Sequence, residues 1–149
     1  RGYVESDAMS DQDPYSCSKG CIEMAVQSYR TSFNLKIATT RAGNVVGGAD
    51  WAEDRLIPDI IRSLKSDNPI VIRSPNSVRP WQFVLEPLRG YLIIAKNLYE
   101  GEDLSGGWNF GPNRESMINV KEIADLIVKK WGSGRVEVQS DNSKFVSSL

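Results

Sequence analysis

Three stretches of the chain repeat apolar residues every three or four positions, and this period predicts amphipathic helices. They run from Tyr15 to about Phe33, from Glu86 to about Tyr99, and from Val120 to Trp131. We expect the first helix to be half-buried, because an apolar stripe normally faces a core. Its stripe consists of Ile22, Ala25, Val26, Tyr29 and Phe33.

Residues at the ends of these stretches are typical of helix termini. Asp13-Pro14 predicts a helix start, because aspartate caps a helix and proline suits its first position. Asn34 predicts the end of the same helix. Asn119 and Gly132 are expected to cap and stop the last helix.

Short runs rich in apolar and β-branched residues predict strands between the helices. The longest run, Leu35–Arg41, follows the first helix and leads into the glycine-rich segment Ala42–Gly48. This order predicts one arm of a parallel α/β sheet, in which ligands bind outside the carboxyl ends of the strands. Further strands are expected at Ile70–Ile72, Trp108–Phe110 and Val136–Val138, and a short helix at Asp59–Lys65.

The composition narrows the class of protein. A length of 149 residues suffices for one domain with a core, and a net charge of −1 offers no basic surface for nucleic acid or anionic membranes. No apolar run approaches the ~20 residues that span a membrane, and the first residues lack the apolar stretch of a signal peptide. The polar segments 1–12 and 139–149 are expected to be loops.

Cys17 and Cys21 are the only cysteines, and they lie four residues apart on the first predicted helix. This spacing does not suit a disulfide framework. Because the chain contains no histidine, carboxylates alone would have to complete a zinc site. We therefore expect two reduced thiols and no metal, which suits a cytoplasmic protein.

Tyr15 and Lys19 are the candidate acid/base pair. Four residues make about one turn of an α-helix, so both side chains leave the same face. A tyrosine hydroxyl ordinarily titrates near pKa ~10, and an ammonium group one turn away favours the phenolate. Tyr-x-x-x-Lys is therefore a plausible base, although the spacing by itself also fits a solvated helix face.

The glycine-rich segment serves either a ligand or only a turn. Gly43, Gly47 and Gly48 permit close approach of the backbone or a positive φ. Asn44 suits either a hydrogen bond to a ligand or a left-handed turn. Both interpretations stay open at this point.

Several blocks resemble one superfamily. Pro14-Tyr15-Ser16-x-Ser18-Lys19 resembles the catalytic helix of extended short-chain dehydrogenases/reductases that act on nucleotide sugars, and Arg41–Gly47 resembles their substrate loop. Within the superfamily the resemblance is greatest to the CDP-glucose 4,6-dehydratases, and it extends over roughly residues 2–132. It rests on RAGNVVGGADWAEDRLIPDIIR (41–62), VRPWQFVLEPLRGY (78–91) and GWNFGPN (107–113).

This resemblance implies a Rossmann-like parallel sheet with part of a small substrate-binding domain. Residues 1–50 would be the C-terminal part of the NAD-binding Rossmann domain, and residues 51–149 a mixed substrate-binding region with returning Rossmann elements. The implied activity is that of a lyase, the NAD-dependent dehydration of CDP-D-glucose to CDP-4-dehydro-6-deoxy-D-glucose. The product would feed 3,6-dideoxyhexose synthesis for bacterial surface polysaccharide, including the O-antigen of lipopolysaccharide. A homodimer is also implied, with the Tyr15 helix in its interface.

The resemblance also implies roles for individual residues. Tyr15 would take the proton of the sugar C4 hydroxyl, and Lys19 would hold the nicotinamide ribose, so that both contact NAD. The Val45 backbone would lie beside the nicotinamide, and Asn44 would bind substrate. Arg79 is the diphosphate candidate, because a guanidinium bonds two phosphate oxygens at once; otherwise it is a surface arginine. The nucleotide pocket would be lined by Arg55, Leu56 and Ile57.

Parts of that family's machinery are absent from this sequence. There is no Gly-x-x-Gly-x-x-Gly fingerprint and no strand with the catalytic Thr/Ser and Asp, and the chain starts with Arg1. We therefore expect an interior piece of a longer enzyme that is inactive by itself. Two alternatives stay open, namely a sibling nucleotide-sugar epimerase or dehydratase, and a non-catalytic remnant that serves as a binding module.

Overall fold

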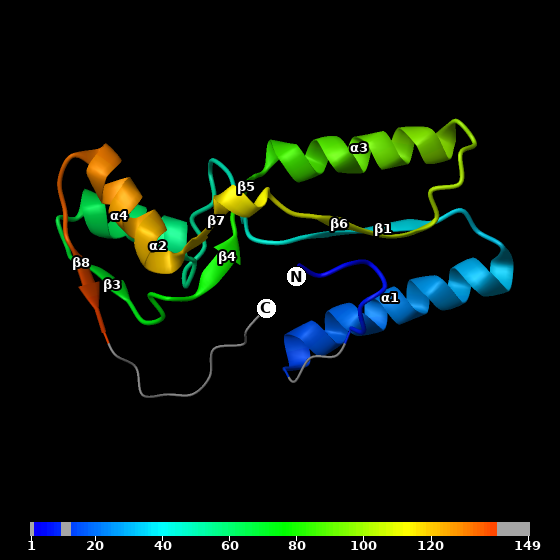
Figure 1. Cartoon of the computed structure of the whole chain (residues 1–149), viewed down its shortest axis with the longest axis horizontal. Coiled ribbons are helices and arrows are strands. Elements are labelled where there is room, and N and C mark those ends of the chain that lie inside the picture. The colour runs from blue at the N-terminus through cyan, green and yellow to red at the C-terminus, as the bar shows by residue number, and fades with distance from the viewer. Residues whose placement is uncertain (1, 10–12, 140–149) are drawn as a thin grey trace. The chain divides into compact units, whose positions relative to one another are not determined.

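Two separate segments of the chain make up each of two compact units (Figure 1). Unit 1 contains the residues up to Ala42 and Leu85–Gly111, and unit 2 contains Gly43–Val84 and the residues from Pro112 onward. The computed structural model describes residues 2–9 and 13–139, so the loops expected at 10–12 and 140–149 lie outside the described residues. The chain crosses between the units three times. The assignment of a cofactor domain and a substrate domain stays a prediction.

Unit 1 is a parallel strand pair between two helices. β1 (Ala38–Ala42) and β6 (Gly106–Phe110) pair in parallel, with Ala38 opposite Gly106 and Ala42 opposite Phe110. α1 (Pro14–Phe33) and α3 (Leu85–Tyr99) lie on opposite sides of this pair (Figure 1). Parallel neighbours need a long crossover, and here it runs through unit 2 and α3. The predicted parallel α/β arrangement is thereby confirmed.

Unit 2 is built from three strand pairs. β2 (Val45–Val46) is parallel to β5 (Gln82–Phe83), and β3 (Ile70–Ile72) is parallel to β8 (Val136–Val138). β4 (Val78–Pro80) is antiparallel to β7 (Met117–Asn119), which follows the 3-10 helix η1 (Arg114–Ser116). The sequence predicted β3 and β8, but it missed β2, β4, β5 and β7, since strands of two or three residues carry little periodicity.

The buried core of unit 2 lies where α2 (Leu56–Lys65) and α4 (Val120–Trp131) pack on β3. Its members come from these three elements and are Ile60, Leu64, Ile70, Ile72 and Ala124. α2 begins at Leu56 rather than at Asp59. Pro58 is tolerated there because the N–H groups of a helix's first turn have no partner within the helix.

The predicted helix termini of α1 and α4 are confirmed. Asn34 ends α1 in the left-handed conformation with φ 50°, and Gly132 ends α4 with φ 91°. Asn119 caps α4 through a hydrogen bond from the Glu122 backbone N–H. The Asn119 N–H in turn donates a hydrogen bond to the Glu122 carboxylate, which completes a capping box.

The apolar stripe of α1 was expected to face a core, but most of it is exposed. Of its five members only Val26 is half-buried, while Ile22, Ala25, Tyr29 and Phe33 are exposed. The less exposed face instead carries mostly polar residues and glycine, namely Ser16, Gly20, Glu23, Val26 and Arg30. On this face Glu23 bonds to β1, as described below.

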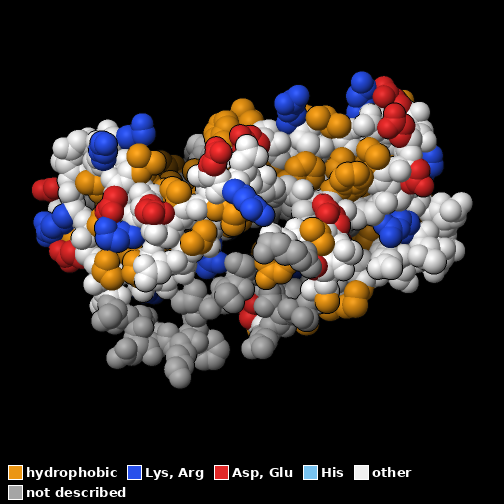
Figure 2. All heavy atoms as spheres, in the orientation of Figure 1, with side chains coloured by type: hydrophobic (Ala, Val, Ile, Leu, Met, Phe, Trp, Pro, Cys, Tyr) orange, Lys and Arg blue, Asp and Glu red, His pale blue; other side chains and the backbone are white. Residues whose placement is uncertain are grey.

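Hydrophobic side chains also remain at the surface over α3 (Figure 2). They line a shallow apolar groove along one face of this helix, together with two basic side chains. The groove residues are Leu85, Leu88, Arg89, Leu92, Ile93 and Lys96.

Close packing inside unit 1 explains the glycine at position 90. A Cβ atom there would lie 1.9 Å from Cε1 of Phe110, whose ring stacks edge-to-face on Tyr91 at 5.2 Å between centroids. We expect Gly90→Ala to lower the free energy of unfolding by about 1–3 kcal/mol, because it overpacks this contact. Urea titration followed by circular dichroism measures the change.

The matched control is Gly111→Ala in the same unit. No atom lies within 4 Å of a Cβ at that position, and the residue is not among those with positive φ. Its unfolding midpoint should stay close to that of the unsubstituted chain. Equal midpoints for both variants would show that the Phe110 ring yields without cost.

Candidate active site

The start of α1 holds Tyr15 in place. Asp13 is the N-cap, and its Oδ1 accepts hydrogen bonds from the Tyr15 N–H at 2.9 Å and the Ser16 N–H at 3.0 Å. Pro14 occupies the first turn, where its missing N–H costs nothing. The backbone that carries Tyr15 is therefore fixed by local interactions that the sequence predicted.

Tyr15 and Lys19 share one face of α1, as their spacing predicted. The Lys19 Nζ atom lies 5.4 Å from the centroid of the Tyr15 ring, within the range of a cation–π contact. Both side chains are exposed, Tyr15 to 67%. A hydroxyl and an ammonium group are thus presented together to a ligand outside the helix.

The Asp13 cap makes the stability of α1 depend on pH. Hydrogen bonds from the Ser16 side chain, the Ser16 N–H and the Tyr15 N–H hold the pKa of Asp13 below its ordinary value of 3.8. A carboxyl whose pKa is depressed by folding contributes stability that is fully present above pH 3.8 and is lost as the pH falls through the folded-state pKa. Asp13→Ala should therefore melt below the unsubstituted chain at pH 7, and the difference should shrink at about pH 2.

Asp13→Asn is the control for this prediction. Asparagine caps helices without a charge, so this variant should keep most of the helix at neutral pH and lose the pH-dependent part. Thermal melts by circular dichroism at both pH values decide the question. The prediction would be contradicted if the melting temperatures of Asp13→Ala and the unsubstituted chain differed by the same amount at both pH values.

A polar contact that the sequence analysis missed attaches α1 to the sheet. Glu23 accepts a hydrogen bond from Thr39 Oγ1 at 2.7 Å, and its carboxylate lies 3.4 Å from Nη2 of Arg41. Thr39 and Arg41 point the same way because alternate residues of a strand share a face. A Cβ atom at Gly107 would lie 1.5 Å from Arg41 Nη2, so glycine leaves room for the guanidinium. The signal in the sequence was the Thr-x-Arg alternation in β1.

Two glycines of the glycine-rich segment Ala42–Gly48, Gly43 and Gly47, allow close packing inside unit 2. A Cβ at Gly43 would lie 2.5 Å from Cγ of Pro80, and one at Gly47 would lie 2.9 Å from Cγ1 of Val84. None of the three glycines of this segment has a positive φ. Gly43 and Gly47 therefore allow the backbone to approach the β4–β5 region, and this role requires no ligand.

Asn44 and Val45 lie next to that close contact. The Asn44 carbonyl oxygen accepts a hydrogen bond from the Gln82 N–H at 3.0 Å, and Val45 pairs with Gln82 in the β2–β5 ladder. The backbone of this segment is thus fixed by a parallel pair, while the Asn44 residue remains exposed.

The other predicted substrate residues lie at two places in unit 2. Arg55 is the N-cap residue of α2 and is exposed, and Leu56 and Ile57 form the first turn of that helix and are half-buried. Leu56 also packs against the core, which gives it a structural role as well. Arg79 is half-buried in β4, opposite Ile118 of β7.

The structure thus divides the predicted site residues by unit. Tyr15 and Lys19 lie in unit 1, and all the predicted substrate residues lie in unit 2 with Val45. Cys17 and Cys21 are free thiols, as predicted, but both are exposed on α1. Within residues 2–9 and 13–139, no cluster of three metal-ligating side chains occurs, and no helix meets the length and apolarity of a membrane span.

The family profile and the similar sequences that match this chain all belong to epimerases or dehydratases. The profile of the NAD dependent epimerase/dehydratase family matches residues 2–110. The CDP-glucose 4,6-dehydratase of Salmonella typhimurium is 50% identical over 141 residues, which cover 88% of this chain and 39% of that enzyme. The dTDP-glucose 4,6-dehydratase of the same organism is 26% identical, with 91% of this chain and 38% of that enzyme covered.

The fold is also found among solved structures. The dTDP-glucose 4,6-dehydratase of Bacillus anthracis, in complex with NAD, superposes with a TM-score of 0.78 at 22% identity. The superposition covers 95% of this chain and 44% of that structure. The chain therefore spans less than half the length of the enzymes that it matches.

Proposed function

Because the chain belongs to the NAD dependent epimerase/dehydratase family, we propose that the whole protein dehydrates CDP-D-glucose to CDP-4-dehydro-6-deoxy-D-glucose, as an NAD-dependent hydro-lyase. The observation that carries this proposal is the 50% identity to a CDP-glucose 4,6-dehydratase. The dTDP-glucose enzyme of the same organism reaches only 26% over a similar span. The difference favours CDP as the nucleotide of the substrate.

Tyr15 serves in this proposal as the base at the sugar C4 hydroxyl. Oxidation of an alcohol needs a group that removes the hydroxyl proton, and the exposed Tyr15 side chain with the Lys19 ammonium beside it offers one. The same hydroxyl and ammonium suit the hydroxyls of a nicotinamide ribose, so Tyr15 and Lys19 would hold that part of NAD. Bound NAD would supply the hydride acceptor that side chains lack.

The substrate residues of unit 2 support the binding of a nucleotide diphosphate. Arg79 contributes a guanidinium, which suits the paired oxygens of a diphosphate. Arg55 adds a second positive charge at the start of α2, and Leu56 and Ile57 add apolar surface there. Asn44 offers an amide for the sugar or the diphosphate. We assign no residue of this chain to the elimination of water from C5 and C6.

A substrate panel tests the proposed function. The whole protein is incubated with NAD and the CDP, UDP, GDP and dTDP derivatives of glucose, and loss of one water from the sugar is followed by mass spectrometry. We expect CDP-glucose to be turned over with the largest kcat/KM. Preferred turnover of another nucleotide, or epimerisation without loss of water, would favour a sibling enzyme. No turnover of any of them would favour a non-catalytic module.

We further propose that the whole protein is a homodimer with α1 in its interface. Ile22, Tyr29 and Phe33 form an exposed apolar stripe on this helix, as an interface helix requires. Sedimentation velocity should give a dimer for the unsubstituted protein and a monomer for Ile22→Asp. A monomer in both cases would remove this part of the proposal.

The free thiols of Cys17 and Cys21 support action in the cytoplasm. The product suits the synthesis of dideoxyhexoses for bacterial surface polysaccharide such as O-antigen. Deletion of the gene in its host should then remove these sugars from the lipopolysaccharide. An unchanged sugar composition would contradict this placement.

A further inference from the structure

We propose that Arg62 is a positioning residue for the nucleotide-sugar pocket, because it holds the loop that joins the two substrate segments of unit 2. This inference rests on the function proposed above. The loop comprises Gly48–Asp54 and connects β2 with α2. Asn44 and Val45 precede it, and Arg55 follows it directly.

The loop does not order itself by burial or by backbone preference. Every residue from Gly48 to Asp54 is exposed, so little apolar surface leaves water when it forms. Ala49 and Asp54 have φ values of 63° and 60°, in the left-handed region that residues with a Cβ adopt at a cost in free energy. Other interactions must therefore hold the loop in this conformation.

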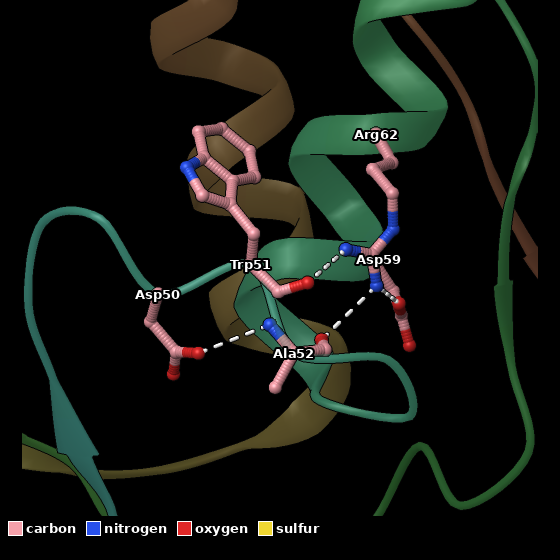
Figure 3. A network of polar contacts seen from close by, with 5 residues as sticks. All are labelled: Asp50, Trp51, Ala52, Asp59 and Arg62. Carbon is pink, nitrogen blue, oxygen red and sulfur yellow. Dashed lines mark hydrogen bonds and ion pairs between the residues drawn. The ribbon is translucent and has the colours of Figure 1, made fainter.

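Arg62 supplies the main attachment (Figure 3). Its Nη1 donates to the carbonyl oxygen of Trp51 at 2.9 Å, and its Nη2 donates to that of Ala52 at 3.1 Å. The same Nη2 pairs with the carboxylate of Asp59, one turn earlier on α2. A guanidinium presents its donors in a rigid fork, so this one side chain fixes two successive peptide groups to the helix.

Two weaker contacts complete the arrangement. Oδ1 of Asp50 accepts a hydrogen bond from the Ala52 N–H at 3.1 Å, which turns the chain toward Arg62. The Lys65 ammonium lies 4.8 Å from the centroid of the Trp51 ring, in a cation–π contact. Arg62 and Lys65, which both contact Trp51, lie one turn apart on α2.

Arg62 also lies on the helix that begins directly after Arg55, its N-cap residue and the first of the predicted nucleotide contacts. It follows Arg55 by seven residues, which is about two turns of an α-helix. Because Asp54 is joined to Arg55, release of the loop frees the chain that enters α2 at the predicted nucleotide contacts. We therefore expect loss of Arg62 to weaken binding of the nucleotide sugar, while the step at Tyr15 is left intact.

Steady-state kinetics of the whole protein test this expectation. Arg62→Ala should raise KM for CDP-glucose about tenfold with kcat within about threefold, because it removes binding that the ground state and the transition state share. Arg62→Lys keeps the charge beside Asp59 but cannot bond both carbonyls in the same way. Its KM should therefore lie between those of the unsubstituted protein and Arg62→Ala. The matched control is Arg135→Ala, which removes an exposed guanidinium of the same unit that bonds only to Glu137 among the contacts described. Its KM should be unchanged.

A second measurement follows the loop itself and does not depend on turnover. Chymotrypsin cleaves after Trp51 only when the loop opens, and mass spectrometry measures the rate of this cut in the native protein. We expect Arg62→Ala to be cut about tenfold faster than the unsubstituted protein, with Arg135→Ala unchanged, because local opening governs cleavage.

The two measurements separate the possible failures. An active unsubstituted enzyme whose KM is not altered by Arg62→Ala overturns the positioning role, whatever the cleavage rate. An unsubstituted protein that turns over no CDP-glucose overturns the proposed function instead. In that case, equal rates of cleavage after Trp51 in the unsubstituted protein and in Arg62→Ala would also show that Arg62 does not hold the loop.

Discussion

Tyr15→Phe is expected to lower kcat of the whole enzyme by about 10²–10⁴-fold, the usual contribution of a general base. The substitution removes one oxygen and leaves the ring that the Lys19 ammonium contacts at 5.4 Å. Tyr15 is 67% exposed, so almost no buried contact is lost. The Asp13 cap bonds the backbone of position 15 and does not depend on its side chain. The loss should therefore be chemical and not structural.

Tyr29→Phe provides the matched control on the same helix. Tyr29 is exposed to a similar degree, 60%, and its ring lies 5.6 Å from that of Phe33. The substitution removes the same hydroxyl group from α1, and we expect kcat to stay within about twofold because no reacting atom is involved. Initial rates at saturating CDP-glucose and NAD, with circular dichroism for each variant, give the comparison. Equal kcat values for the two variants would exclude Tyr15 as the base.

Ile60→Ala is expected to lower the free energy of unfolding by about 2–5 kcal/mol, the usual cost of a large cavity in a core. Ile60 is 0% exposed in α2 and belongs to the core that this helix forms with β3 and α4. Domains are stable by only about 5–15 kcal/mol, so this single change removes a large part of the total. Because α2 also carries Arg55–Ile57 and Arg62, the predicted substrate contacts depend on this core.

Ile61→Ala is the control for Ile60→Ala. The two residues are of the same type and adjacent in α2, and they differ in burial, since Ile61 is only half-buried. Urea unfolding of each variant, fitted with a common slope, should give less than half the loss for Ile61→Ala. Equal losses would mean that burial in this core does not set the cost of the substitution in α2, because alanine favours the helix equally at both positions.

Local features of the fold followed from short stretches of sequence. Asp13-Pro14 and Asn34 predicted both ends of α1, and Asn119 and Gly132 predicted those of α4. Each of these signals acts through hydrogen bonds or φ values within a few residues of itself. The pattern of helix, strand and glycine-rich loop also predicted a parallel sheet, and β1 and β6 pair in this way.

The orientation of α1 did not follow from its sequence. Its most regular apolar stripe is exposed, and the inward face instead carries Glu23, which bonds to Thr39 and Arg41. Periodicity identifies an apolar face but does not say whether the rest of the domain or a second chain covers it. The alternation in β1 places Thr39 and Arg41 on one strand face, but only the packed structure reveals that Glu23 is their partner.

The helix ends and the placement of Tyr15 and Lys19 on one helix face followed from the sequence alone, because each depends on neighbours within about one turn. The parallel α/β class followed from the order of helix, strand and glycine-rich segment along the chain. The division of the chain into two units, each made of two separate segments, became visible only in the folded structure. Only the tertiary structure decided that Gly43 approaches Pro80 and that Arg62 holds the backbone of Trp51 and Ala52. These contacts join residues 10 to 37 positions apart. Their partners are set by the packing of whole elements, which no local pattern of residues encodes.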